Sequence, residues 1–461
     1  MYTLDYKKPV HVHFIGIGGI SMSGLAEVLL DRHFTISGSD NKESDLTKHL
    51  ESIGAKISYP QSADNVTGDI DLFVYTAAIH PDNPDFVAAK ATGKPMLTRA
   101  ELLGQIMSNY NRSVAIAGTH GKTSTTSMVS QILLEGDENP TLSIGGILNA
   151  IKSNIHVGDS DIFVTEACEY TNSFLSFFAK YSIILNIEAE HLDFFKDLDD
   201  IRNSFRKFAS NTLEDGAIII NGEIPDYKDV VNGLGRKVIT FGLHDGDFDY
   251  TATDITFNEL GQPSFHVIYQ GEDLGVVQLH VPGEHNVKNA LAAIATVREM
   301  GATMEMITEG LKKFSGADRR FQYKGKLANG AVVIDDYAHH PTEIAASLAA
   351  AKNYPHERMI VVFQPHTYTR TKAFLADFGK ALSAADIVIL ADIYAAREDD
   401  IYGVSSLDVK KEVEKHNTTC YYFPSFEEIE KFLLKNCQEG DVLITMGAGD
   451  VYKIGDSLIG D

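Results

Sequence analysis

The chain has 461 residues, of which 44% are hydrophobic and 23% charged, as in an ordinary globular protein. This length exceeds what one hydrophobic core supports and predicts about three domains. The excess of 64 acidic over 40 basic residues gives a formal net charge of −24. This charge argues against a nucleic-acid partner or an acidic membrane surface.

The distribution of hydrophobic residues and the cysteines indicate the cellular compartment of the protein. No apolar run is long enough for a membrane helix, and the first residues lack the apolar core of a signal peptide. The three cysteines form no CxxC pair and fit a reducing compartment. We therefore expect a cytoplasmic protein with neither a membrane nor a nucleic-acid partner, and the sequence leaves its oligomeric state open.

The first 110 residues alternate between strands and helices like a nucleotide-binding βαβ unit. The predicted elements are a strand over 10–15, a glycine-rich segment over 16–24, a helix over 25–31, and strands over 34–37 and 72–75. Asp40 lies where a ribose-binding acid belongs, but Ser21 replaces the third glycine of the dinucleotide fingerprint. Nicotinamide binding is therefore disfavoured, and the segment fits either a diphosphate at a helix N-terminus or a purely structural turn.

The segment AIAGTHGKTSTT at 115–126 carries the strongest functional signal. It is predicted to form a strand over 113–117, a tight turn over 118–121 and a helix over 123–134. Such a turn directs backbone N–H groups and the positive end of the helix dipole at one point. Lys122 adds a full charge there, and the Thr123 hydroxyl suits Mg²⁺. Although Ile116 replaces the first glycine of the common template, we expect a nucleoside triphosphate to bind.

The rest of the central segment supplies candidate metal ligands. Strands are predicted over 161–165, 181–186 and 216–221. Glu166 follows the first of them and His191 lies after the second, and ligands bind beyond the carboxyl ends of such strands. We expect both side chains to converge with Thr123 on one Mg²⁺. Because Mg²⁺ prefers oxygen ligands, His191 could instead act through a neighbour without touching the ion.

The pattern restarts near residue 318. Strands are predicted over 331–335, 359–363, 387–390 and 441–445. Each is followed by polar residues or glycines, so this segment also contributes a binding face. His339 and His340 suggest a metal site, but adjacent side chains point apart and no third nitrogen or sulfur ligand stands at a usable spacing. We therefore predict no metal there.

Together these motifs resemble the Mur ligases of peptidoglycan synthesis over essentially the whole chain. The resemblance rests on the segments 16–24, 117–123, 166–170, 186–193, 283–289, 318–321, 335–343 and 363–371. It implies an α/β fold of three domains: a Rossmann-like UDP-binding domain (1–110), a central P-loop ATPase-like domain (111–317) and a C-terminal Rossmann-like domain (318–461). The last two segments resemble the members that add L-alanine.

The resemblance implies a reaction with ATP, Mg²⁺, UDP-N-acetylmuramate and L-alanine. The UDP-sugar carboxylate attacks the γ-phosphate of ATP, and the amino group of alanine attacks the acyl phosphate, in an early step of peptidoglycan synthesis. Phosphoryl transfer of this kind needs charge neutralisation more than covalent help.

The resemblance also implies the site residues. The nucleotide set is Gly118, Thr119, His120, Gly121, Lys122, Thr123, Ser124, Asn286 and Asn289, with Arg320 and Asp336 from the C-terminal domain. The Mg²⁺ set is Thr123, Glu166 and His191, and His340 and Arg370 face the incoming alanine. The UDP-sugar set is Gly16, Gly18, Gly19, Ser21, Ser39, Asp40, Thr76, Ala77 and Arg99.

Two departures and three rival interpretations stay open. Many members carry arginine where this chain has Thr367, and Lys207 lies near the region of a carbamylated lysine of related ligases without aligning to it. The nearest rival is the recycling ligase that attaches a whole tripeptide to UDP-N-acetylmuramate. A nicotinamide oxidoreductase and a non-catalytic nucleotide-sensing module are the others. Because Lys122 lies on the second domain and Arg320 and Asp336 on the third, we expect domain closure to complete the site.

Overall fold

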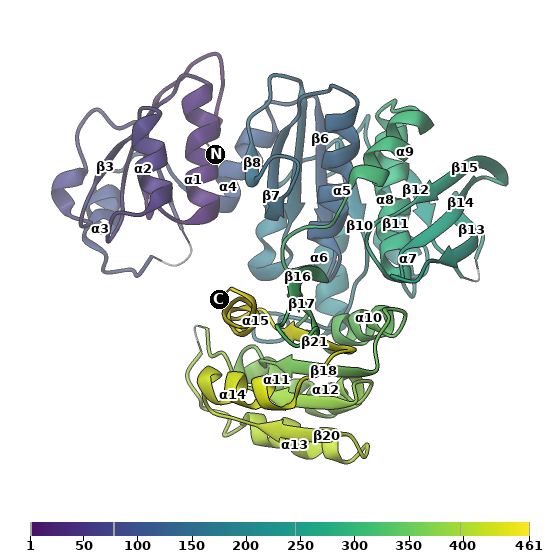
Figure 1. Ribbon diagram of the computed structural model, residues 1–461. Helices are drawn as coiled ribbons and strands as arrows, with labels where there is room; N and C mark the ends of the chain where they lie inside the picture. The colour runs from purple at the N-terminus through teal and green to yellow at the C-terminus, as the bar shows by residue number, and fades with distance from the viewer. Residues whose placement is uncertain (1, 77–78, 245, 397, 461) are drawn as a thin grey trace.

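The computed structural model describes residues 2–76, 79–244, 246–396 and 398–460, and the strands of these segments form three separate sheets (Figure 1). The amino-terminal unit lies beside the central unit, next to β7 and β8, and the carboxy-terminal unit lies below the central one in the view of Figure 1. The predicted α/β class is confirmed. The boundaries at 110 and 317 stay predictions.

The first sheet has the strand order β3-β2-β1-β4-β5, and all its pairs are parallel. Its elements are β1 (His11–Ile15), α1 (Ile20–Asp31), β2 (Thr35–Ser39), α2 (Asp45–Ser52), β3 (Lys56–Ser58), η1 (Ala63–Asn65), β4 (Leu72–Tyr75), α3 (Pro84–Ala91), β5 (Met96–Thr98) and α4 (Arg99–Met107). The order reverses between β1 and β4, which is where ligands bind in doubly wound sheets.

Helix α1 begins at Ile20 and not at residue 25, so the prediction of its start was wrong. The residues over 21–24, which include Ser21, Ser23 and Gly24, were assigned to the glycine-rich turn. Gly24 instead allows this part of α1 to pack closely on the central unit, because a Cβ at this position would lie 3.2 Å from the Ile155 side chain. The amino end of α1 therefore lies at Gly19, inside the glycine-rich segment.

The central sheet has the order β15-β14-β13-β12-β11-β10-β6-β9-β7-β8. Its elements are β6 (Arg112–Ala117), α5 (Lys122–Glu135), β7 (Thr141–Leu148), β8 (Ser153–His156), β9 (Ile162–Ala167), η2 (Tyr170–Ser176), β10 (Tyr181–Ile184), α6 (Leu198–Ser210), β11 (Ala217–Asn221), α7 (Tyr227–Val231), β12 (Lys237–Phe241), β13 (Tyr250–Phe257), β14 (Pro263–Tyr269), β15 (Glu272–Gln278), α8 (Glu284–Glu299) and α9 (Met304–Lys313). The strands from β12 to β7 are parallel, and β8 and the β13–β15 hairpins are antiparallel edges.

The third sheet has the order β16-β17-β21-β18-β19-β20, in which β16 is antiparallel. Its elements are β16 (Gln322–Lys326), β17 (Val332–Asp336), α10 (Pro341–Ala351), β18 (Arg358–Phe363), α11 (Tyr368–Ala373), α12 (Leu375–Leu382), β19 (Ile387–Leu390), α13 (Ser406–Glu414), β20 (Thr419–Tyr422), α14 (Phe426–Asn436), β21 (Asp441–Met446) and α15 (Tyr452–Ile459). Of its central strands, β21 is buried along its whole length and β18 is buried apart from Arg358, as the apolar runs in the sequence predict.

Each of the three sheets has apolar side chains buried around it. The core of the first unit continues into the central unit through Leu102 and Phe174, so α4 packs directly on η2. Among the described helices, none combines the length and the apolar character that crossing a membrane requires.

Candidate active site

The phosphate-binding turn lies between β6 and α5 and is built into the apo fold. Gly118 and Gly121 have φ of 149° and 82°, which favour glycine, and a Cβ on Gly121 would meet Asn289 Oδ1 at 2.6 Å. Asn186 holds the turn from β10: its Oδ1 accepts from the His120 backbone N–H at 2.7 Å, and its amide donates to the His120 carbonyl at 3.1 Å. The turn is therefore fixed before any nucleotide arrives.

Lys122 lies in the first turn of α5 and is paired with a buried carboxylate that the sequence analysis did not assign. Its Nζ lies 3.0 Å from Glu169 Oε2 and 3.2 Å from the Thr119 carbonyl, and it also donates to the Gly118 carbonyl. Burial opposes the charge of Lys122, but Glu169 outweighs it and raises the lysine pKa. The lysine is thus cationic and held beside the turn.

The proposed Mg²⁺ ligands occupy neighbouring positions, with one correction. Glu166 lies inside β9 and not after it, because the strand continues to Ala167. Its Oε1 accepts from the Gly145 backbone N–H at 2.6 Å. A Cβ on the next residue, Gly146, would lie 3.2 Å from the Thr123 methyl group. Glu166 and Thr123 therefore approach β7 at neighbouring residues, Glu166 through its carboxylate and Thr123 through its methyl group.

His191 faces a different carboxylate from the one expected. Its Nε2 lies 3.6 Å from Glu169 Oε1, and its ring stacks on Tyr170 with 4.5 Å between centroids. Burial lowers the pKa of His191, so the ring is neutral near pH 7. Glu169 thus joins His191 to Lys122, and the structure brings His191 beside the lysine. Lys207 is exposed on α6.

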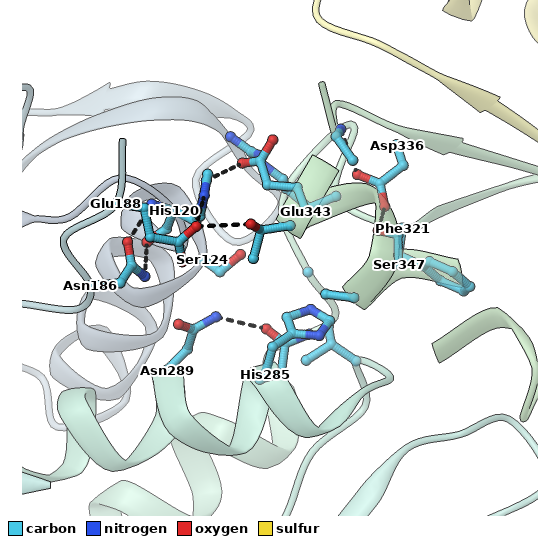
Figure 2. A pocket seen from close by; sticks show the side chains of 18 of the residues that line it. His120, Ser124, Asn186, Glu188, His285, Asn289, Phe321, Asp336, Glu343 and Ser347 are labelled. Carbon is cyan, nitrogen blue, oxygen red and sulfur yellow. Dashed lines mark hydrogen bonds and ion pairs between the residues drawn. The ribbon is translucent and has the colours of Figure 1, made fainter. Parts of the chain in front are cut away.

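A cavity of about 170 Å³ lies between the central and C-terminal units (Figure 2). The predicted nucleotide residues that line it are His120, Gly121, Ser124, Asn286, Asn289, Arg320 and Asp336. Asn289 donates to Asn286 Oδ1 at 3.1 Å, and Asn286 donates to the Pro282 carbonyl at 2.8 Å. Two amides are thus preoriented on the wall that α8 provides.

Arg320 and Asp336 reach this cavity from the C-terminal unit. An Arg320 guanidinium nitrogen lies 3.5 Å from Thr123 Oγ1, and the group stacks 5.0 Å from the centre of the Tyr337 ring. Asp336 accepts from Ser347 and from the Ala338 backbone N–H at 3.0 Å. Burial raises the pKa of Asp336 to about 6. Arg320 and Asp336 thus already share one cavity with His120, Gly121 and Ser124 of the phosphate-binding segment, whereas Lys122 does not line it.

His120 is surrounded by carboxylates from both units. Its Nε2 lies 3.4 Å from Glu188 Oε2, and its Nδ1 lies 3.2 Å from Glu343 Oε1 (Figure 2). Burial alone would lower the pKa of His120, but the two carboxylates outweigh it and raise the pKa to about 9. The imidazolium therefore balances negative charge where the two units meet.

Arg370 and His340 were expected to face the amino-acid substrate. Arg370 instead donates from Nε and Nη2 to Glu190 Oε1, at 2.9 and 2.7 Å. Burial would raise the pKa of Glu190, but Arg370 outweighs this and lowers it to about 2. His340 is buried and lines a second cavity, of about 570 Å³, together with Phe374. Arg370 is thus occupied by a central-domain carboxylate in this structure.

The UDP-sugar residues gather at the amino end of α1. The Gly18 N–H donates to Asp40 Oδ2 at 2.8 Å, and Arg99 donates to Ser21 Oγ at 3.0 Å. The Gly16 N–H donates to the Ser39 carbonyl at 2.9 Å. Thr76 also lies close to Gly16, where a Cβ on this glycine would come within 3.0 Å of the Thr76 methyl group. Gly19 caps α1, and Ala77 lies outside the described residues.

Arg99 also interacts with the central unit. Its guanidinium is largely buried, and burial lowers its pKa against an opposing interaction with Cys168. Cys168 precedes Glu169, the partner of Lys122. Arg99 therefore links the predicted UDP-sugar residues electrostatically to the segment that follows β9.

Sequence reasoning missed the acidic side chains of the site, which are Glu169, Glu188, Glu190 and Glu343. All four lie within the motifs 166–170, 186–193 and 335–343 but were given no role. These carboxylates could have been found from the many cationic and imidazole side chains in the same motifs, because a buried charge requires a partner of opposite charge.

Comparison with known proteins supports a single family for the whole chain. Residues 11–111 match the model "Mur ligase family, catalytic domain", residues 116–297 match "Mur ligase middle domain", and residues 319–449 match "Mur ligase, glutamate ligase domain". The chain belongs to the Mur ligase family. The predicted resemblance is thereby confirmed.

Individual relatives of this Mur ligase cover it from end to end. It is 63% identical to the UDP-N-acetylmuramate--L-alanine ligase of Agathobacter rectalis and 56% identical to that of Lachnospira eligens, with 100% of both chains covered in each comparison. Its structure is similar to that of the UDP-N-acetylmuramate-alanine ligase of Thermotoga maritima, with a TM-score of 0.79, 30% identity and 98% of both chains covered.

Proposed function

We propose that this Mur ligase joins L-alanine to the lactyl carboxylate of UDP-N-acetylmuramate, converting ATP to ADP and phosphate, in an early cytoplasmic step of peptidoglycan synthesis. The observation that carries the proposal is the cavity shared by the P-loop and by Arg320 and Asp336 of the C-terminal unit. The full-length relatives named for this reaction support the choice of substrates.

The reaction proceeds in two steps. A carboxylate oxygen of the UDP-sugar attacks the γ-phosphorus of ATP, and the bond to ADP breaks. The amino group of L-alanine then attacks the acyl carbon, a proton leaves the nitrogen, and phosphate departs with the oxygen that came from the carboxylate. The phosphoryl group carries its charge on oxygens throughout, so preorganised cations supply most of the catalysis.

Lys122 and Arg320 neutralise the transferring phosphoryl group. Lys122 exchanges Glu169 for phosphate oxygens, and Arg320 already reaches Thr123 at the start of α5. Thr123 and Glu166 fit Mg²⁺ because a hydroxyl and a carboxylate supply the oxygen ligands that this ion prefers. Mg²⁺ would supply further charge neutralisation there. His191, which is neutral and lies next to Glu169, orients the Glu169 carboxylate.

Asn286 and Asn289 bind the adenine end of the nucleotide, with amides that α8 holds in place. In the first unit, the first backbone N–H groups of α1 face the UDP diphosphate at the amino end of the helix, whereas those of Gly16 and Gly18 are already bonded to Ser39 and Asp40. The alanine carboxylate replaces Glu190 on Arg370, because both offer the same charge and a guanidinium binds carboxylates through paired hydrogen bonds. His340 lines the second cavity together with Phe374.

The recycling ligase is the second candidate, since it shares the segment 335–342. The segment 363–371 favours the alanine enzyme, and the full-length relatives carry the alanine name. A murein peptide ligase from Psychrobacter arcticus has the same fold, with a TM-score of 0.71, 23% identity and 98% of both chains covered.

The test is phosphate release from ATP and Mg²⁺ in the presence of UDP-N-acetylmuramate. L-alanine is compared with the L-Ala-D-Glu-diaminopimelate tripeptide, and each substrate is omitted in turn. The proposal expects release with L-alanine and all three substrates together. Release with the tripeptide alone would assign the chain to recycling, and ATP binding without any release would favour a sensing module.

A further inference from the structure

A second group of metal-ligating side chains stands where the central and C-terminal units meet. One ring nitrogen each of His120 and His340 and one carboxylate oxygen of Glu188 lie within 4.8 Å of one another. His120 follows β6, Glu188 follows β10 and His340 precedes α10. The sequence analysis rejected a metal beside His340 because no third ligand stood at a usable spacing. The fold supplies the missing ligands from another domain.

The histidine nitrogens of this group are buried. His340 Nε2 has no hydrogen-bond partner among the described residues, and His120 Nε2 lies 3.4 Å from Glu188 Oε2. The two imidazole rings face each other with 4.8 Å between centroids. Leaving a polar nitrogen buried without a partner costs free energy, which a ligand at His340 Nε2 would recover.

The surrounding side chains orient the group as a metal site requires. Glu343 Oε1 lies 3.2 Å from His120 Nδ1, so Nδ1 keeps its proton when an ion displaces the proton on Nε2. Thr342 donates its hydroxyl to Glu188 Oε2 at 2.8 Å. His340 Nδ1 accepts from the Thr342 N–H at 3.3 Å, and this long bond is given up when an ion at Nε2 moves the ring proton to Nδ1.

We propose that His120, Glu188 and His340 bind one divalent ion of the zinc class and leave a fourth position for water or a phosphate oxygen. Two imidazoles, one carboxylate and an open position form a common tetrahedral zinc arrangement. Nitrogen donors favour zinc over magnesium, so this site differs in chemistry as well as in residues from that of Thr123 and Glu166. Bonds of about 2.1 Å require the donors to close in by roughly 1 Å.

The ion would tie the P-loop to the C-terminal unit. His120 belongs to the turn that cradles phosphate, and His340 is the first residue before α10, so a bound ion fixes their separation. It also occupies a wall of the nucleotide cavity, which His120 and Glu188 line. Zinc therefore inhibits phosphate release by holding the two units together, and a chelator restores the activity.

The direct test uses Co²⁺ as a spectroscopic probe of the chelator-treated, nucleotide-free full chain. The proposal expects the intense visible absorption of tetrahedral cobalt, saturating at one ion per chain and displaced by Zn²⁺. Glu188→Gln keeps the shape of its side chain, and His340→Asn removes the imidazole but retains a residue that caps helices well. Each should weaken cobalt binding by at least about tenfold.

Two control variants separate this site from other cobalt ligands. His191→Gln alters the proposed Mg²⁺ region, and His266→Gln alters a histidine on β14; both should keep the absorption band. No band in the wild-type protein would overturn the proposal, as would a band that survives His340→Asn or one that His191→Gln abolishes. Phosphate release by chelator-treated protein with Mg²⁺ is measured separately, so the ligase proposal stands or falls on its own.

Discussion

Lys122 and Glu169 form a buried ion pair at the mouth of the phosphate-binding turn, with 3.0 Å between Nζ and Oε2. Only 2% of Glu169 is exposed, so its charge is compensated by the protein and not by bulk water. Any phosphate that binds this turn must compete with the carboxylate for the lysine. The pair therefore keeps Lys122 charged and oriented in the free protein, and exchange of Glu169 for phosphate belongs to nucleotide binding.

The first prediction follows from this exchange. Lys122→Met should lower phosphate release by at least about 10²-fold, the usual effect of removing one preorganised donor from a transferring oxyanion. Binding of UDP-N-acetylmuramate, measured by calorimetry, should stay within about twofold, because its predicted residues lie on the first unit. Equal loss of both would show that this division of roles is wrong.

A matched double variant controls for stability. Lys122→Met leaves the buried Glu169 beside His191 but without its cationic partner, and breaking a buried ion pair in this way typically costs about 3–5 kcal/mol. Lys122→Met with Glu169→Gln removes both charges and should recover most of the unfolding free energy while phosphate release stays low. If activity returned together with stability, the effect of Lys122→Met would be structural and not catalytic.

The second prediction concerns Arg370. Lysine keeps the charge but cannot form the paired hydrogen bonds of a guanidinium. Arg370→Lys should therefore raise the KM for L-alanine by about 10-fold or more, the effect of losing about 1.4 kcal/mol of binding. The KM values for ATP and for the UDP-sugar should change little. A selective rise in the KM for ATP would instead place Arg370 at the nucleotide.

The third prediction uses the buried carboxyl of Asp336, whose pKa burial raises to about 6 from 3.8. The folded protein holds this proton more tightly than the unfolded chain, so the group makes stability fall as pH rises from about 4 to 6. Above pH 6 the resulting loss in the free energy of unfolding is at most about 3 kcal/mol, at 1.36 kcal/mol per pKa unit.

Asp336→Asn should consequently stabilise the nucleotide-free protein at pH 7–8, and its advantage should vanish near pH 4. Chemical unfolding midpoints over this pH range measure the effect, with Asp399→Asn on the surface as a control. An advantage that does not depend on pH would mean that packing, and not ionisation, separates the variant from the wild type.

The fourth prediction concerns motion. The contacts between Arg320 and Thr123 and between Arg370 and Glu190 already join the central and C-terminal units. Because ATP must enter the cavity between them, we expect these contacts to open and reform. Solution scattering should give different profiles with and without an ATP analogue plus UDP-N-acetylmuramate. Superimposable profiles would contradict closure.

Much of the fold could be predicted from local sequence. The parallel strands are short apolar runs that end in glycine or polar residues. The strand predicted over 387–390, for example, has the same first and last residues as β19. The β13–β15 hairpins were not predicted because their partly exposed strands mix polar with apolar residues. The start of α1 was misplaced because Gly24 serves packing against Ile155 and does not end a turn.

The site was predictable where one motif holds all the parts, as at Gly118, Lys122 and Thr123. It was not predictable where function depends on contacts between distant segments. Glu190 and Arg370 are 180 positions apart, and the partnership of His120 with Glu343 also crosses the domain interface. Linear spacing contains no information on such pairs, because domain docking alone brings them together.

The central claim is that the UDP-sugar carboxylate itself attacks the γ-phosphate of ATP. The most direct measurement uses UDP-N-acetylmuramate whose lactyl carboxylate carries ¹⁸O, with ATP, Mg²⁺ and L-alanine, and follows the label by mass spectrometry. The account predicts that one carboxylate oxygen appears in the released phosphate and the other stays in the new amide. Phosphate without label, formed while the alanine product accumulates, would contradict the acyl-phosphate route.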